Sequence, residues 1–266
     1  MSPPTCVNAF GRTTCSARIL RSFAALSQAA SARAANPRRV GWPFGRRNVW
    51  YAQRGEDRRL AELLRRRRRG FYIDVGAWHP EKDSTTKYFY DRGWRGINVE
   101  PHPTFFAMLE RERPRDINLN VALGDRPGDE AFTLVGETGL STFEKPFAAS
   151  AERWVLENRE EPAVVTTVPV RITTLADICR TNVPAGMEID FLKIDVEGWE
   201  DRVLRGADWD AYRPNILVIE AVEPLKDVAA WEPWDAYVRD QRYDFIEFDG
   251  LNRWYRRSST QARSLS

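Results

Sequence analysis

The chain of 266 residues is 42% hydrophobic, which is enough to build one large α/β domain with extensions or two small domains. Its net charge of +2 is unevenly spread: residues 1–55 carry nine arginines and no acid, and the remainder holds 38 acidic residues against 31 basic ones. An acidic folded part excludes nucleic acid as the expected partner. The three cysteines form no CxxC pair, which excludes a disulfide framework and a zinc knuckle and favours a reducing compartment. No apolar run approaches the roughly 18 residues of a membrane span, so we expect no integral membrane segment.

Residues 1–50 are rich in Ala, Ser and Arg and contain no acid. This composition is typical of an organellar transit peptide, of a disordered tail, or of sequence added by a start codon placed too far upstream. We therefore predict a disordered or targeting extension over 1–50, a main domain over 51–258 and a flexible tail over 259–266. The predicted location is cytoplasmic, or organellar if the extension is a transit peptide.

Helix and strand patterns alternate along the main domain. Leucines at helical spacing predict a helix over 55–64, and the five arginines of 65–69 form either its solvated basic end or an anion-binding patch. Short β-branched or apolar runs predict strands at 71–75, 96–100, 117–123, 131–135, 164–172, 191–196, 215–222, 243–250 and 252–257. Helices are predicted between them, at 84–92, 103–112, 174–180, 200–207 and 234–241, whereas 136–163 has no clear pattern.

This alternation predicts an α/β fold: a Rossmann-like, doubly wound and mostly parallel sheet that ends in an antiparallel pair of strands. Ligands of such sheets bind beyond the carboxyl ends of the strands. Acids stand at four of these ends, namely Asp74, Glu100, Asp195 and Glu220. The sequence therefore predicts a site at this edge, although such acids also cap helix N-termini.

The segment FYIDVGAWHP (71–80) opens like a nucleotide-binding loop but keeps a single glycine, Gly76. A dinucleotide fold uses three glycines to approach a pyrophosphate, which Asp74 would repel. An acid at this place instead suits a cationic or amine-bearing cofactor such as S-adenosylmethionine. Glu100, 26 residues after Asp74, is suited to accept hydrogen bonds from two ribose hydroxyls. The loop therefore favours S-adenosylmethionine over NAD(P).

Seven sequence blocks occur in one order: YAQRGEDRRL (51–60), GFYIDVGAWHP (70–80), YFYDRGWRGINVEPHP (88–103), INLNVALGD (117–125), STFE (141–144), DFLKIDVEGWEDRVLRGADW (190–209) and YRPNILVIEA (212–221). Together they resemble the FkbM-type methyltransferase family, over residues 51–222 and more loosely to 257. The most specific block is KIDVEGWEDRVLRG. The resemblance implies an S-adenosylmethionine-dependent enzyme with a Rossmann-like fold. Family members typically methylate hydroxyl groups of sugars, lipid-linked glycans or polyketide natural products.

The resemblance also assigns roles to residues of this sequence by position. Asp74, Gly76 and Ala77 would form the loop on the methionine side, Glu100 would hold the ribose, Asp125 would lie beside the adenine, and Asp195 and Glu197 would face the methyl-transfer centre. The sequence departs from the commonest family pattern at Trp78 and Pro80, where Asn and Gly are more usual. The backbone path of this loop therefore stays open.

An alcohol is a poor nucleophile, so methyl transfer to a hydroxyl needs a base or a metal ion. The candidate bases are His79, Asp195 and Glu197. Each has a structural alternative: His79 bonded to its own loop, Asp195 as a helix cap and Glu197 in a first helical turn. Asp195, Glu197 and Glu220 are also possible oxygen ligands of Mg²⁺, although their spacing specifies no metal site.

Other residues are assigned to structure or to specificity. His102 is expected to shape the turn into the following helix, and the aromatic stretch 88–94 is expected to belong to the core rather than to an acceptor pocket. Acceptor specificity is expected from 136–163, with STFEKPF (141–147) nearest the site, and from the tryptophan-rich stretch 230–237.

The sequence thus predicts an S-adenosylmethionine-dependent O-methyltransferase that acts on a hydroxyl of a sugar, glycolipid or natural-product acceptor. Two alternatives remain: an NAD(P)-dependent oxidoreductase of Rossmann topology, and a catalytically silent Rossmann-like binding module. The expected partner is a small-molecule or glycan acceptor, and the sequence does not specify an oligomeric state.

Overall fold

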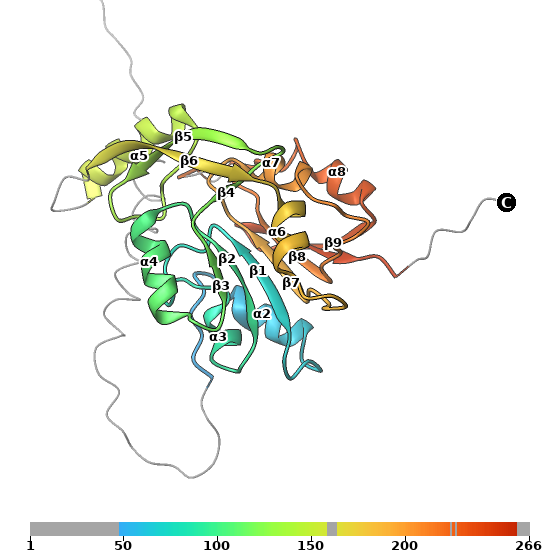
Figure 1. Cartoon of the computed structure of the whole chain (residues 1–266). Coiled ribbons are helices and arrows are strands. Elements are labelled where there is room, and N and C mark those ends of the chain that lie inside the picture. The colour runs from blue at the N-terminus through green and yellow to red at the C-terminus, as the bar shows by residue number, and fades with distance from the viewer. Residues whose placement is uncertain (1–47, 159–163, 224, 227, 260–266) are drawn as a thin grey trace, which may run out of the picture. The chain divides into compact units, whose positions relative to one another are not determined.

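The computed structural model describes residues 48–158, 164–223, 225–226 and 228–259 (Figure 1). The predicted N-terminal extension, apart from its last three residues, lies outside the described residues. So does the predicted tail beyond residue 259. The nature of these two segments and the domain limits of 51–258 therefore stay predictions.

Seven strands form the central sheet, in the order β3-β2-β1-β7-β8-β10-β9. Their bounds are Phe71–Val75 (β1), Arg95–Val99 (β2), Ile117–Leu119 (β3), Phe191–Ile194 (β7), Ile216–Glu220 (β8), Tyr243–Phe248 (β9) and Asn252–Arg257 (β10). The first five strands in that order are parallel, and β10 runs antiparallel to both β8 and β9. This arrangement confirms the predicted Rossmann-like sheet with its antiparallel terminal pair.

The order of the strands reverses at β1. This strand pairs with β2 on one side and with β7 on the other, in a register that sets Asp74 beside Asn98 and Lys193. Ligands of open α/β sheets bind at such a reversal, beyond the carboxyl ends of the strands. The sheet therefore brings the loops after β1, β2 and β7 to the edge where a site is expected.

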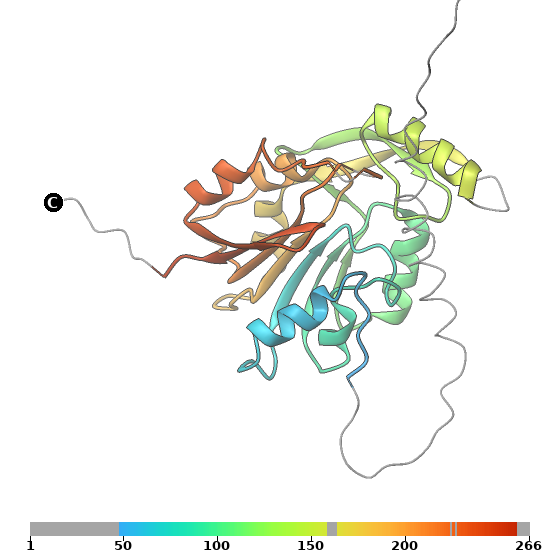
Figure 2. The same ribbon diagram turned by 180° about the vertical axis from the view of Figure 1, so that it is seen from behind.

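Helices cover both faces of the sheet (Figures 1 and 2). They are α2 (Glu56–Leu63), α3 (Lys87–Tyr90), α4 (Pro103–Glu112), α6 (Leu175–Asn182), α7 (Glu200–Arg205) and α8 (Asp235–Asp240). On one face, Leu60 of α2 and Phe89 of α3 pack with Phe191 and Trp254 of the sheet. On the other face, α6, α7 and α8 form a larger core with the strands. β1 and β8 are buried along their whole length, as apolar runs between two helical layers should be.

A smaller sheet, β4-β6-β5, is inserted between β3 and α6. It contains β4 (Ala122–Leu123), β5 (Gly128–Val135) and β6 (Val165–Thr173), and helix α5 (Lys145–Asn158) connects β5 to β6. This inserted unit lies beyond the ends of the central strands, at the top of Figure 1. The predicted single strand over 117–123 was wrong, because β3 and β4 belong to different sheets, and 136–163, where the sequence has no clear pattern, contains α5. At the break after β3, Asn120 Nδ2 donates to the carbonyls of Glu100 and Pro101, and the chain leaves the central sheet.

The aromatic stretch 88–94 and the basic run 65–69 lie in different environments. The aromatic stretch 88–94 belongs to the core, since Tyr88, Phe89, Tyr90 and Trp94 are buried. In the basic run that follows α2, Arg67 forms ion pairs with Glu188 and Asp190. Within the described part of the chain, no helix is long and apolar enough to cross a membrane.

Candidate active site

The loop after β1 begins at Gly76, whose backbone lies against the end of β7. Its φ of 75° is in the left-handed region, and a Cβ on this residue would lie 1.8 Å from the carbonyl oxygen of Asp195. Glycine is therefore required for this close approach. The amides of Gly76 and Ala77 donate to the carbonyl of Val99 at 3.0 and 3.2 Å. The loop is thus fixed where the ends of β1, β2 and β7 meet.

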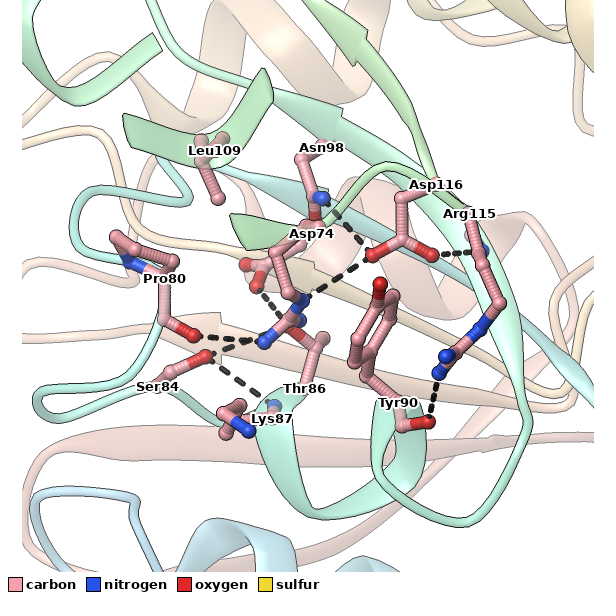
Figure 3. Close-up of polar contacts among 12 residues, drawn as sticks. Asp74, Pro80, Ser84, Thr86, Lys87, Tyr90, Asn98, Leu109, Arg115 and Asp116 are labelled. Carbon is pink, nitrogen blue, oxygen red and sulfur yellow. Dashed lines mark hydrogen bonds and ion pairs between the residues drawn. The ribbon is translucent and has the colours of Figure 1, made fainter. Parts of the chain in front are cut away.

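Asp74 of β1 is almost completely buried. Its Oδ2 accepts a hydrogen bond from Thr86 Oγ1 at 2.9 Å, and Thr86 Oγ1 accepts one from Arg113 Nη2 at 2.6 Å (Figure 3). Its Oδ1 has no hydrogen-bond partner among the described residues, and Lys193 Nζ lies 3.7 Å from it. Burial raises the pKa of Asp74, while Lys193 and Arg113 oppose this rise. Asp74 therefore offers the site one oriented oxygen that can still accept a hydrogen bond.

A buried network beneath this carboxylate joins the end of α4 to the sheet (Figure 3). Arg113 forms an ion pair with Asp116 at 3.3 Å and donates to the carbonyl of Pro80 at 2.7 Å. Asp116 also accepts hydrogen bonds from Tyr72 and Asn98. Because a buried charge must be paired, this network fixes the segment that follows the glycine loop.

Glu100 follows β2 and is buried. The backbone amides of Trp78 and His102 donate to its two carboxylate oxygens, each at 2.7 Å. Burial raises the pKa of Glu100 to about 7, although these two hydrogen bonds lower it. The carboxylate thus joins the β1 loop to the turn into α4, and both oxygens keep a free lone pair. His102 caps α4 by accepting a hydrogen bond from the amide of Thr104, which confirms its predicted structural role.

Trp78 and His79 occupy the part of the loop that departs from the family pattern. Trp78 has a φ of 48°, in the left-handed region. His79 Nδ1 accepts hydrogen bonds from the amides of Glu81 and Lys82 at 3.1 and 2.9 Å. Burial lowers the pKa of His79, and the charges that act on it belong to Glu112 and to its own loop. The structure therefore gives His79 a contact with its own loop and does not bring it to the acids after β7.

Lys193 and Asp195 lie at the end of β7, beside Asp74. Lys193 Nζ is 3.2 Å from Asp195 Oδ2 and 3.7 Å from Asp74 Oδ1, and it donates to the carbonyl oxygen of Gly76 at 3.3 Å. The side chain of Lys193 is 12% exposed and that of Asp195 is 28% exposed. Burial alone would lower the pKa of Lys193, but Asp195 and Asp74 raise it above its ordinary value. The lysine therefore stays charged and balances two carboxylates.

The loop between β7 and α7 is held by hydrogen bonds from its backbone amides to Glu200, the first residue of α7. Glu200 Oε1 accepts hydrogen bonds from the amides of Val196 and Gly198 at 3.0 and 3.3 Å. Glu197 has a φ of 55°, in the left-handed region. α7 begins at Glu200, so Asp195 does not occupy its N-cap position. The strand-end position of Asp195 is therefore not explained by helix capping.

Glu220, at the end of β8, forms an acidic group with Asp195, Glu197 and Glu200. Burial raises the pKa of each of the three glutamates, to about 7 for Glu200, and neighbouring carboxylates contribute to the rise. Glu220 Oε2 is buried, and no described residue gives it a hydrogen bond. Carboxylates with raised pKa values are suited to accept a proton from an alcohol.

The inserted unit contacts the acidic group through the segment STFE. Thr142 Oγ1 donates to the carbonyl of Glu197 at 3.1 Å. The ring of Phe143 lies 4.8 Å from that of Trp199, measured between centroids. STFE thus lies next to the loop after β7, and the predicted place of STFEKPF nearest the site stays a prediction.

Asp125 has a different environment from the other predicted cofactor residues. It follows β4, and its Oδ1 lies 3.5 Å from Arg202 Nη1 of α7. Both side chains are more than one-third exposed. The structure thus places Asp125 in a surface ion pair, and its predicted position beside an adenine stays a prediction.

A magnesium site finds no support in this arrangement. Across the described ranges, no three His, Cys, Asp or Glu side chains are placed to hold a metal ion. Of the three suggested ligands, Asp195 is already paired with Lys193.

The sequence-based reasoning did not single out Lys193 and Arg113. Lys193 is the one charged residue in the strand FLKI, which is otherwise apolar. A charge inside a strand that helices cover on both faces requires a partner, so this signal was available. Arg113 carries no comparable signal, because the chain contains 35 arginines and nothing in the local sequence distinguishes this one.

The site lies where the strand order reverses, and the acid after β2 is bound to the loop after β1. These features, together with the antiparallel strand between β8 and β9, define a Rossmann-like methyltransferase. The sequence matches the methyltransferase FkbM domain over residues 74–245, which is more than half of the chain. The chain therefore belongs to the FkbM methyltransferase family, as its sequence blocks indicated. This membership sets aside the NAD(P)-dependent oxidoreductase.

Several solved methyltransferase structures are distantly similar to the chain. A TehB-like SAM-dependent methyltransferase from Corynebacterium glutamicum is 9% identical, with a TM-score of 0.41 over 91% of this chain and 100% of that one. The 1,6-didemethyltoxoflavin-N1-methyltransferase of Burkholderia thailandensis, solved with bound 1,6-didemethyltoxoflavin and S-adenosylhomocysteine, is 10% identical, with a TM-score of 0.37 over 95% and 93%. An O-methyltransferase from Bacillus cereus in complex with SAH is 12% identical, with a TM-score of 0.33 over 90% and 89%. None of the curated proteins matches this chain.

Proposed function

We propose that this methyltransferase uses S-adenosylmethionine to methylate a hydroxyl group of a sugar, glycolipid or natural-product acceptor. The observation that carries the proposal is the joint position of Asp74, Gly76 and Glu100 at the point where the strand order reverses. An acidic group with raised pKa values lies beside them, at the ends of β7 and β8. Family membership supports methyl transfer, and the resemblance to FkbM enzymes supports a hydroxyl acceptor.

The residues of the β1 loop fit S-adenosylmethionine better than a dinucleotide. The buried Oδ1 of Asp74, which lacks a hydrogen-bond partner among the described residues, suits an ammonium group. Both oxygens of Glu100 can accept a further hydrogen bond from a ribose hydroxyl. The cofactor would supply an electrophilic methyl group on a sulfonium. Ala77 belongs to the same loop, and Asp125 is our proposed contact on the adenine side.

Among the predicted catalytic residues, Glu197 is the best candidate for the base. Its carboxylate has neither a hydrogen bond nor an ion pair with a described residue, whereas Asp195 is held by Lys193. Burial raises the pKa of Glu197, and the charges of Asp195 and Glu200 raise it further. A base of raised pKa accepts the proton of an alcohol more readily. We assign Asp195 to the orientation of the acceptor hydroxyl and place His79 outside the reacting groups.

The inserted unit is the proposed source of acceptor specificity. Its STFE segment contacts the loop that carries Glu197, through Thr142. An acceptor that reaches Glu197 would therefore pass the inserted unit. Loops on a rigid sheet commonly determine the specificity of such enzymes.

Calorimetric titration tests the cofactor assignment. The purified chain is titrated with S-adenosylhomocysteine and, separately, with NAD and NADP. We expect it to bind S-adenosylhomocysteine, and we expect Glu100→Ala to weaken this binding at least about tenfold because it removes the ribose contact. Glu110→Ala is the matched control, since Glu110 is exposed on α4.

The outcomes separate the hypotheses. Binding of NAD or NADP alone would refute the cofactor assignment, and binding of none of the three would favour a silent module. If Glu100→Ala binds S-adenosylhomocysteine as tightly as the wild type does, Glu100 does not hold the ribose. Once binding is established, transfer of a labelled methyl group to glycans, polyketides and lipids identifies the acceptor. The Glu197→Gln variant then tests the base, because it should lower kcat and leave cofactor affinity unchanged.

A further inference from the structure

Lys193 occupies a place that the proposed reaction does not by itself require. It is a lysine within a strand of the central sheet, only 12% exposed, and its ammonium group has three oxygen neighbours. These are Asp195 Oδ2 at 3.2 Å, the carbonyl oxygen of Gly76 at 3.3 Å and Asp74 Oδ1 at 3.7 Å. The ammonium group donates to the carbonyl of Gly76 and forms ion pairs with both carboxylates, and its distance from Asp74 Oδ1 leaves that oxygen able to accept a hydrogen bond.

The three acceptors belong to two different parts of the proposed site. Asp74 and the carbonyl of Gly76 belong to the loop assigned to the cofactor, whereas Asp195 belongs to the end of β7, where the methyl acceptor is expected. Asp74 and Lys193 are paired across β1 and β7, which explains why the lysine reaches both parts. Within the described site, Lys193 therefore connects the cofactor side to the acceptor side.

The charge of Lys193 acts on its neighbour Asp74 and also on acids that it does not contact. It lowers the pKa values of Asp74, Glu100, Glu197 and Glu56, which belong to β1, to the end of β2, to the loop after β7 and to α2. The charge of Arg113, at the end of α4, also lowers the pKa of Asp74. At Glu200 and Glu220, the neighbouring charges are carboxylates, which oppose ionisation.

We propose that Lys193 is a positioning residue that holds the cofactor loop and the acceptor-side carboxylate in one arrangement and supplies the positive charge beside the cofactor-binding acids. The inference rests on the proposed function, because it concerns affinity for S-adenosylmethionine and its product. Lys193 need not touch the cofactor. Its effect passes through Asp74, which it keeps available to an ammonium group, and through Glu100, which it keeps available to a ribose.

Calorimetric titration with S-adenosylhomocysteine at about pH 6.5, 7.5 and 8.5 tests this role in Lys193→Met. Without the cation, the pKa values of Asp74 and Glu100 rise, so both acids bind protons that a ligand ammonium or ribose would have to displace. We expect affinity to fall at least about tenfold at pH 6.5, and the loss to shrink as the pH rises. Lys193→Arg should recover part of the affinity because it restores the charge.

Lys87→Met is a matched control. Lys87 is 19% exposed and, at the start of α3, is paired with Asp91, the residue that ends this helix. The Lys87→Met variant should bind S-adenosylhomocysteine as tightly as the wild type does. The far-UV spectrum and the thermal transition show whether Lys193→Met folds. If it does not, the double variant Lys193→Met/Asp195→Asn is titrated in its place. This double variant removes one carboxylate charge together with the cation and should show the same pH-dependent loss.

Three results would overturn the inference: a Lys193→Met affinity equal to that of the wild type, a loss that does not vary with pH, or no recovery by Lys193→Arg. A pH-independent loss would mark Lys193 as a structural residue only. Failure of the wild-type chain to bind S-adenosylhomocysteine is a different outcome, since it refutes the proposed function. The two failures are therefore distinguishable in one set of titrations.

Discussion

Replacement of Gly76 by alanine should lower both the stability of the fold and its affinity for the cofactor. Gly76 has a φ of 75°, and an alanine Cβ would lie 1.8 Å from the carbonyl oxygen of Asp195, whereas real Cβ contacts essentially never fall below 3.0 Å. The atom that it would meet belongs to backbone, so no side-chain rotation relieves the overlap. The ends of β1 and β7 would have to separate.

The structure allows the cost to be divided into two parts. A non-glycine residue in the left-handed region costs about 1–2 kcal/mol. Relief of overlap inside a packed region adds about 1–3 kcal/mol, for a total of about 2–5 kcal/mol. Gly55→Ala isolates the first part, because Gly55 has a φ of 87° and nothing lies within 4 Å of its would-be Cβ. Gly128→Ala should have almost no effect, since Gly128 has open space and no left-handed φ.

Urea unfolding followed by circular dichroism gives the free energies of unfolding, and calorimetry gives the affinity for S-adenosylhomocysteine. We expect Gly76→Ala to be destabilised more than Gly55→Ala and to lose most of its affinity, because the displaced loop also carries the amide that binds Glu100. A Gly76→Ala variant no less stable than Gly55→Ala would refute the reasoning from close approach. Unchanged affinity would show that this loop does not form the cofactor site.

Further predictions concern charge. The pKa of Glu100 is raised to about 7 by burial, so the native chain keeps a proton that the unfolded chain releases above its ordinary pKa. The contribution of Glu100 to the free energy of unfolding is therefore fully present below about pH 4.5 and is lost as the pH rises through about 7. In Glu100→Gln, the free energy of unfolding should lose this pH dependence, which amounts to up to about 3 kcal/mol across the range. If the unfolding free energy of the variant falls with pH as steeply as that of the wild type, the assignment to Glu100 is contradicted. Arg113→Met should destabilise by about 3–5 kcal/mol in urea unfolding because it leaves the buried carboxylate of Asp116 unpaired. Arg111→Met, which removes an exposed ion pair, should cost less than about 1 kcal/mol, and equal costs would argue against burial as the cause. Asp125→Asn should change stability by less than about 1 kcal/mol, so a loss of S-adenosylhomocysteine affinity in this variant would support its contact with the adenine.

Most of the central sheet could be predicted because its strands are continuous apolar runs that local sequence reveals. The division of 117–123 between two sheets could not, because it coincides with hydrogen bonds from Asn120 to carbonyls some twenty residues earlier. Helix α5 was also missed. Phe147, Ala151 and Val155 are four residues apart and pack together in a cluster, but the small and polar residues between them weaken the pattern.

The acids of the site could be predicted from their positions at strand ends, since parallel strands bring those ends to one edge. Their partners could not be predicted in the same way. Lys193 donates a hydrogen bond to Gly76, which lies 117 positions earlier in the sequence, and Arg113 donates one to Thr86, which lies 27 positions earlier. Such contacts depend on which strands are neighbours, and local sequence does not contain that order. The hydrogen bonds that Nδ1 of His79 accepts from the amides of Glu81 and Lys82 also depend on the folded loop, and its role as a base stays a prediction.

The place of β10 between β8 and β9 constrains the order in which the chain can fold during synthesis. β8 is translated well before β10, so its outer edge stays unpaired while the intervening residues emerge from the ribosome. Trp254 and Tyr255, which are almost fully buried, reach the core only at that late stage. A nascent chain that stops before Asn252 would therefore expose an apolar strand edge. We expect such fragments to aggregate or to need chaperones rather than to act as smaller enzymes.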